Sequence, residues 1–157
     1  MWDDPMKVSP YRIDVMKLSD FAAVSRLWRN SEGIGLNESD TRANIAIYLK
    51  RNPRMSFVAR KGRTLVGAVL CGHDGRRGYL HHLAVAKDHR GNGIGKKLVE
   101  ASFSGLTRAG ITRCNIYLFN SNTEGEAFWL HNGWTKRAEL QMLQKAVGKA
   151  AQPGCGC

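Results

Sequence analysis

Two neighbouring histidines and a basic, glycine-rich segment are the parts of this chain best suited to chemistry. His81 and His82 lie in the apolar run of residues 80–85, and Arg90-Gly-Asn-Gly-Ile-Gly-Lys96 follows a few positions later. An imidazole titrates near pH ~6.5, so it can accept a proton close to neutrality. A glycine-rich turn that opens a helix presents unpaired backbone N–H groups to an anion. The combination indicates proton transfer beside a phosphate-bearing cofactor.

The spacing excludes two common phosphate-binding loops. A Walker A loop is excluded because Lys97 stands where serine or threonine is required and Arg90 where the first glycine is required. A dinucleotide-binding loop is excluded because Lys96 occupies the position of its third glycine. The pattern that remains is Arg90-x-x-Gly93-x-Gly95 at the end of an apolar strand.

This pattern resembles the acetyl-CoA loop of the GNAT superfamily of N-acetyltransferases, Arg/Gln-x-x-Gly-x-Gly/Ala. A second block, Asn122 followed by Phe128-Trp129 and then by Gly133-Trp134, is similar to the family's C-terminal motif. The resemblance covers roughly residues 10–140, and the blocks stand in the family's order. The strand before the loop is also similar to that of arylalkylamine N-acetyltransferase, which has a histidine at the position of His81.

The resemblance implies that the chain binds acetyl-CoA and releases CoA. In this family the acyl-pantetheine lies in a gap beside the strand before the loop, like a missing strand. The implied contacts are backbone groups of Leu83, Ala84 and Val85 for pantetheine, the Arg90 side chain and the main-chain amides of Gly91, Asn92, Gly93, Ile94, Gly95 and Lys96 for the pyrophosphate, Asn122 for the pantetheine arm, and Trp129 near its sulfur.

His81 is the predicted general base. Strand alternation places Tyr79, His81 and Leu83 on one face and His82 on the other, so only one histidine is expected to face the substrate. The similarity of the strand favours His81. The alternative is a strand histidine whose ring bonds to a backbone carbonyl or to solvent.

Acidic residues in the loop of residues 30–40 compete for the same role. Glu32 could bind a cationic amine or act as a base through water, and Glu38 and Asp40 lie nearby. Asp40 is most simply the cap of the following helix. A solvated loop is the alternative for each of these residues.

Trp129 departs from the family pattern, because many members carry a tyrosine there whose hydroxyl protonates the leaving thiolate. An indole N–H does not give up a proton near neutral pH. A thiol with a pKa of ~8.5 is nevertheless a fair leaving group. His131, Tyr117 or water could supply the proton.

The elements that must position these residues follow from hydrophobic periodicity and from turn signals. Strands are expected at residues 12–18, 55–60, 64–73, 79–85, 114–119 and 136–143, and helices at residues 20–29, 40–52, 93–110 and 122–131. This order is that of the GNAT fold. It predicts an α+β domain whose mixed, mostly antiparallel central sheet has six to seven strands, with helices on both faces and a splay around the acetyl-CoA cleft.

Length and composition favour one globular domain. The chain has 157 residues, of which 43% are hydrophobic, and we expect a single domain over residues 1–147 with a disordered tail over residues 148–157. Neither a membrane-spanning run nor a signal peptide is evident, and the four cysteines do not form a disulfide framework, so a cytoplasmic location is expected. No metal site is expected, and the chain is expected to be a monomer or a homodimer.

The sequence therefore predicts an acetyl-CoA-dependent N-acetyltransferase whose acceptor is a small amine or a protein or peptide amine. The net charge of +11 keeps an alternative open, namely a non-catalytic acyl-CoA-sensing or nucleic-acid-associated module on the same fold. Nucleic acid is the less favoured partner, because the positive residues are scattered and lack interleaved aromatic residues.

Overall fold

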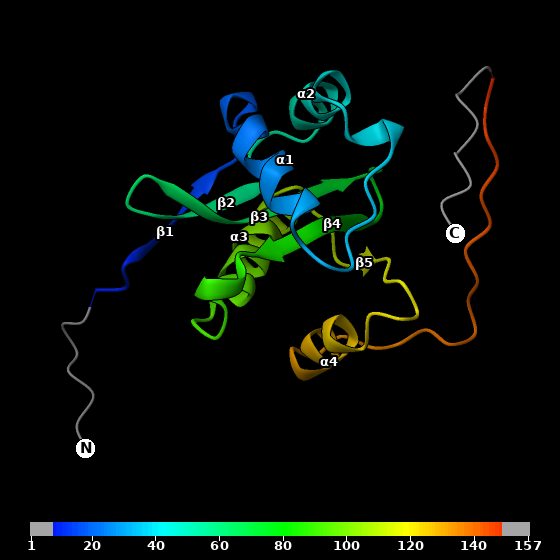
Figure 1. Cartoon of the computed structure of the whole chain (residues 1–157). Coiled ribbons are helices and arrows are strands. Elements are labelled where there is room, and N and C mark those ends of the chain that lie inside the picture. Colours follow the sequence, from blue (N-terminus) through cyan, green and yellow to red (C-terminus); the bar gives the residue numbers. More distant parts are fainter. Residues whose placement is uncertain (1–7, 149–157) are drawn as a thin grey trace.

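The computed structural model describes residues 8–148, which form a five-stranded mixed sheet covered by helices (Figure 1). The strands lie in the order β1-β2-β3-β4-β5, and only the β4–β5 pair is parallel. Their bounds are β1 Tyr11–Val15, β2 Phe57–Lys61, β3 Thr64–His73, β4 Gly78–Val85 and β5 Cys114–Ile116. The α+β class and the mixed sheet are confirmed. The predicted count of six to seven strands is wrong for the described residues.

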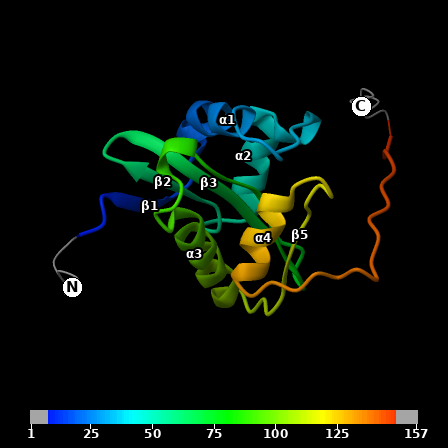
Figure 2. The ribbon, with the colours of Figure 1, turned by 60° about the horizontal axis from the view of Figure 1, so that its bottom comes forward.

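Two helical layers cover the two faces of the sheet (Figure 2). α1 (Phe21–Arg29) and α2 (Arg42–Arg51) pack on one face through Val24, Trp28 and Ile45. α3 (Ile94–Arg108) and α4 (Thr123–His131) contribute to the second core cluster, on the other face. Amphipathic spacing explains the burial of α1 and α3, whereas α2 and α4 each bury a single residue, Ile45 and Trp129.

The start of α2 differs from the prediction. Thr41, rather than Asp40, is its N-cap, and the Thr41 hydroxyl accepts a hydrogen bond from Asn44 N at 3.2 Å. Asp40 closes a short 3-10 turn, η2 (Glu38–Asp40), in which its Oδ2 accepts from Asn37 N at 3.0 Å. Its other carboxylate oxygen is therefore available for a long-range partner.

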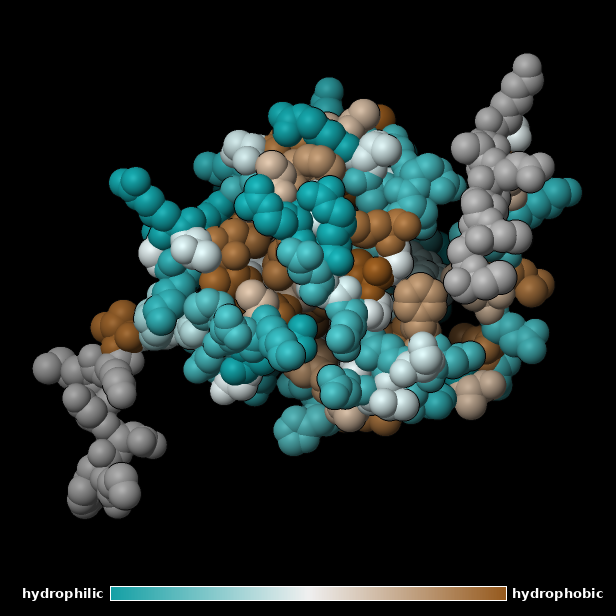
Figure 3. Space-filling model, viewed as in Figure 1, coloured by the Kyte–Doolittle hydropathy of each residue, from teal (hydrophilic) through white to brown (hydrophobic). Residues whose placement is uncertain are grey.

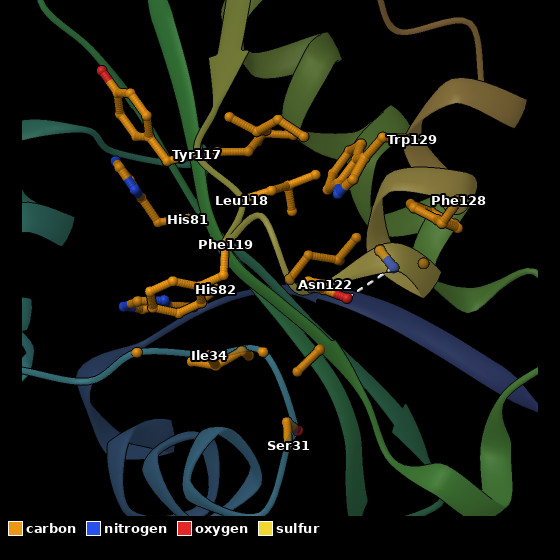
Figure 4. A pocket seen from close by; sticks show the side chains of 18 of the residues that line it. Ser31, Ile34, His81, His82, Tyr117, Leu118, Phe119, Asn122, Phe128 and Trp129 are labelled. Carbon is orange, nitrogen blue, oxygen red and sulfur yellow. Dashed lines mark hydrogen bonds between the residues drawn. The ribbon is translucent and has the colours of Figure 1, made fainter. Parts of the chain in front are cut away.

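β4 contains a bulge that breaks its alternation. Ala84 pairs with Ala68 and His81 with Leu70, so two residues of β4 stand opposite one residue of β3. His82, within the bulge, has φ of 54°, a left-handed conformation that non-glycine residues rarely adopt. The rings of His81 and His82 therefore turn to the same side of the sheet (Figure 4). The prediction that strand alternation places the two histidines on opposite faces is wrong.

β4 and β5 diverge after a short paired region. Their pairing ends at Leu80 and Ile116, so β5 is shorter than the predicted strand of residues 114–119. Beyond this point residues 81–85 of β4 have β3 on one side and, within residues 8–148, no strand on the other. The sheet is thus splayed between β4 and β5, the last pair of strands in the described sheet.

The segment after α4 does not form the predicted strand over residues 136–143. It runs extended and away from the sheet (Figure 1), and the exposed fractions of Leu140, Met142 and Leu143 are 62%, 61% and 91%. Alternating residues stabilise a strand only when a neighbour pairs with its backbone. The tail predicted to be disordered covers residues 148–157. All of it except residue 148 lies outside the described part of the chain.

Candidate active site

The loop between β4 and α3 has an open helix N-terminus. Gly91 and Gly93 have φ of 80° and 73°, values suited to glycine, and Gly93 is the N-cap of α3. No side chain caps this helix, so its first backbone N–H groups have no side-chain partner within the described residues. This is the arrangement that binds an anion at a helix N-terminus.

The third glycine of the loop has a different purpose. A Cβ built on Gly95 would lie 3.3 Å from Cζ of Phe128, whereas none built on Gly91 or Gly93 would meet an atom within 4 Å. Gly95 therefore allows α4 to pack closely on α3. Gly91 and Gly93 instead allow the positive φ values of the turn and leave the space around it open to a ligand.

Arg90 and Asn92 hold the loop in place. Arg90 Nε donates to the carbonyl oxygen of Val85 at 3.0 Å, which ties the loop to the end of β4. Asn92 Nδ2 donates to His89 O at 3.0 Å, and the Asn92 side chain does not line the cleft described below. The Asn92 side chain thus supports the loop, whereas the prediction concerns its main-chain amide.

A cleft of about 2420 Å³ occupies the gap between β4 and β5 and reaches the loop. Its walls include Leu83, Ala84, Val85 and the loop residues Gly93 and Lys96. Seen as in Figure 1, the surface is mainly hydrophilic, with apolar side chains gathered in its middle (Figure 3). The cleft therefore joins an anion-binding end to a mixed apolar and polar interior.

The loop between α1 and η2 closes over this cleft. Gly33 and Gly35 approach Asn122 and Phe119 so closely that a Cβ at Gly35 would lie 2.7 Å from Phe119 Cζ. Figure 4 shows Ile34 of this loop facing the segment that carries Phe119 and Asn122. The loop and this segment together narrow the opening between the two strands.

His81 lies in an aromatic environment on the wall of the cleft. Its ring centroid lies 6.4 Å from that of Tyr79, 6.4 Å from that of Tyr48 and 6.5 Å from that of Tyr117. Burial lowers the pKa of His81, and the neighbouring charge of His82 lowers it further. A neutral imidazole is therefore favoured at this position.

His82 has a carboxylate partner. Its Nε2 lies 2.8 Å from Oδ1 of Asp40, and the two side chains are only 18% and 10% exposed. Burial alone would raise the pKa of Asp40, but hydrogen bonds from His82 and from Asn37 N outweigh it and hold that pKa below its usual range. Trp28 Nε1 donates to the carbonyl oxygen of His82 at 2.8 Å. Sequence reasoning missed this arrangement, since it joins three distant segments.

The other three predicted residues lie in three different environments. Glu32 is exposed on the wall of the cleft. Asn122 is the N-cap of α4, with Oδ1 accepting from Gly125 N at 2.9 Å, so its side chain caps that helix. Trp129 is 7% exposed in the core and packs against Trp134, with ring centroids 4.8 Å apart. It also borders the cleft.

The possible proton donors for a leaving thiolate differ in exposure. Tyr117 is 58% exposed and lines the cleft, as does His131. The hydroxyl of Tyr48 is buried without a hydrogen-bond partner among the described residues, and burial raises its pKa. Tyr117 and His131 are therefore better placed than Tyr48 to supply a proton.

Two structural features are absent from residues 8–148. No group of three or more histidine, cysteine, aspartate or glutamate residues there is arranged to hold a metal ion. No helix within the same range has the length and apolar character to cross a membrane. Cys155 and Cys157 lie outside these residues.

Comparison with known proteins agrees with this geometry. Residues 21–134 match the model of the acetyltransferase (GNAT) family. An acetyltransferase of Yersinia pestis (strain Pestoides F) is 30% identical over 110 residues, which are 70% of this chain and 77% of the relative.

Two solved structures share the fold. One is Ard1 from Thermoplasma volcanium, with a TM-score of 0.71, 19% identity and coverage of 81% of this chain and 84% of the other. The second is the PaiA N-acetyltransferase of Thermoplasma acidophilum in complex with coenzyme A, with a TM-score of 0.70, 19% identity and coverage of 80% and 89%.

Proposed function

The chain belongs to the acetyltransferase (GNAT) family, and from this premise we propose that it transfers the acetyl group of acetyl-CoA to a primary amine. The family makes the chain an acetyl-CoA-dependent acyltransferase. Our proposal adds direct attack by the amine within a ternary complex. The acceptor is a small amine or an amine of a protein or peptide.

One observation supports this proposal above the others: the gap between β4 and β5 leads directly to the uncapped N-terminus of α3. The diphosphate of CoA suits the amides of Gly91 to Lys96, and the positive side chains of Arg90 and Lys96 lie at the same end. Pantetheine suits the free edge of β4 at Leu83 to Val85, where no strand of the described chain competes for the backbone groups. The residues present therefore fit the cofactor.

The acceptor amine would approach on the side of the histidines. An alkylammonium group has a pKa of about 10.4, so a base must take its proton before it attacks the thioester. His81, His82 and, through water, Glu32 are the bases that line the cleft. Both histidines are candidates, because the bulge turns both rings to one side.

The leaving thiolate does not require the missing tyrosine. Trp129 is buried and its indole cannot act as an acid, so we assign it a packing role beside the sulfur end of pantetheine. A thiol pKa of ~8.5 allows the thiolate to leave and to be protonated by Tyr117, His131 or water.

Thiol release tests the proposal. The protein is mixed with acetyl-CoA and with a panel of amines and N-terminal peptides, and free CoA thiol and acetylated product are both measured. We expect amine-dependent thiol release matched one to one by product. Thiol release that no amine increases, together with no acetylated product, would contradict the proposed function.

The alternative of a non-catalytic acyl-CoA-sensing or nucleic-acid-associated module is not favoured. The matched relatives are named acetyltransferases, and the cleft contains ionisable groups in addition to a binding loop.

A further inference from the structure

We infer that His82, oriented by Asp40, takes the proton from the acceptor amine. The inference rests on the proposed function, because it names the base of the same reaction. It also replaces the sequence-based choice of His81.

The geometry of the pair is that of an oriented base. His82 Nε2 donates to Asp40 Oδ1 at 2.8 Å, and the carboxylate is fixed from its other side by Asn37 N at 3.0 Å. Such a contact sets the tautomer, so that Nδ1 carries the free lone pair. His82 Nδ1 has no hydrogen-bond partner among residues 8–148, and His82 lines the cleft. The ring can therefore accept a proton from the cleft.

An ionised carboxylate lies beside one of the two histidine rings and not beside the other. The titratable groups facing His82 are Asp40 of η2 and His81 of β4, while Glu32 and Tyr48 lie elsewhere on the cleft wall. Asp40 stays ionised next to the ring, because its hydrogen bonds outweigh burial and lower its pKa. His81 has no carboxylate partner in the described structure, and burial disfavours its charged form. Asp40 bonds directly to His82 and not to His81, although its charge also reaches His81.

The backbone at His82 is held in an uncommon conformation. A φ of 54° costs free energy in a non-glycine residue, on the order of 1–2 kcal/mol, and such strain persists only where surrounding structure fixes it. Trp28, which is 1% exposed, fixes it by donating Nε1–H to the His82 carbonyl. The result of the strain is that the ring points toward Asp40 and the cleft, rather than to the opposite face of β4.

The proton balance is straightforward. His82 Nδ1 takes one proton from the ammonium group, and the resulting amine attacks the thioester carbonyl carbon. The C–N bond forms, the C–S bond breaks, and the nitrogen loses its second proton as the amide forms. Of the two protons, one ends on the CoA thiol and the other reaches solvent when His82 is regenerated. No oxidant or further reactant is needed.

Asparagine substitutions at the two histidines test the assignment. Asparagine adopts positive φ more readily than most residues, so His82→Asn keeps the bulge while removing the base. We expect kcat to fall at least ~100-fold in His82→Asn, in line with the usual contribution of a general base, and the KM for acetyl-CoA to change little. His81→Asn, the matched control, should lose less than about tenfold.

Two measurements distinguish a catalytic role of His82 from a purely structural one. Added imidazole should restore turnover to His82→Asn, which a merely structural role would not allow. Asp40→Asn should lower kcat while the KM for acetyl-CoA changes little, because the His82 ring loses the contact that orients it. Thermal melting and calorimetry with CoA establish that each variant is folded and binds the cofactor.

The outcomes are distinct. If the wild type turns over but His82→Asn keeps its rate and pH profile, or if His81→Asn shows the larger loss, the assignment to His82 is wrong and the proposed function stands. If the wild type itself acetylates no amine, the proposed function fails and this assignment fails with it.

Discussion

Replacement of Gly93 by alanine should weaken CoA binding through the backbone alone. Gly93 has φ of 73°, and a Cβ built there would meet no atom within 4 Å, so the substitution adds strain without a clash. A left-handed non-glycine residue costs about 1–2 kcal/mol. We expect the exposed turn to relax this strain by moving the amides of the α3 N-terminus. A loss of that size corresponds to a roughly 5- to 30-fold rise in the Kd for CoA.

Gly62→Ala is the matched control. Gly62 has φ of 59° and equally open surroundings, but it lies in the β2–β3 hairpin and does not line the cleft. The same strain should lower its melting temperature by about 2–8 °C, given ~2–4 °C per kcal/mol for a chain of this size, while the Kd for CoA stays within about twofold. Calorimetry and thermal melting measure both quantities. Equal Kd values for the two variants would refute the assignment of the diphosphate to this turn.

Three further predictions concern other parts of the structure. Trp28→Phe removes the hydrogen bond to the His82 carbonyl. The free energy of unfolding measured with urea should therefore fall by about 1–3 kcal/mol, and kcat should fall with it. An unchanged kcat would show that the bulge does not need this bond. Burial lowers the pKa of His81 from 6.5, so the unfolded state binds more protons just below that pH, and the free energy of unfolding should fall as pH drops through 6.5. His81→Phe should remove this part of the pH dependence. An unaltered pH dependence in the variant would disprove the effect of His81. Leu143→Ser, at a side chain that is 91% exposed, should change stability by less than about 0.5 kcal/mol; a large loss would show that residues 136–143 pack as a strand after all.

The loop of the proposed cofactor site could be predicted from the sequence, because its residues are contiguous in the chain. The glycines at positions 91 and 93 are followed directly by an amphipathic helix. The spacing of these glycines therefore predicts both the turn and the uncapped start of the helix. The structure refines this result, since Gly95 serves packing against Phe128 and Asn92 supports the loop.

The proposed acceptor side could not be predicted from the sequence, because it depends on contacts between distant segments. The bulge at His82 is stabilised by Trp28 of α1 and by Asp40 of the η2 turn, which lie 54 and 42 residues away. Simple alternation therefore assigned the two histidines to opposite faces. Only the positive φ at His82 shows that they share one.

The strand count was overestimated for a related reason. Alternation in residues 136–143 describes a segment able to pair, but pairing needs a partner edge. β5 offers only Cys114–Ile116, and the described segment lies away from it. A periodicity of two is thus necessary for a strand and is not sufficient.

The most direct test of the account observes the backbone amides of the β4–α3 loop during titration. In isotope-labelled protein, the amide resonances of Gly91, Gly93 and Gly95 should shift on addition of CoA, and should remain unchanged with pantetheine, which has no diphosphate. If CoA binds while these amides do not respond, or if pantetheine moves them equally, the diphosphate lies elsewhere and the account is contradicted.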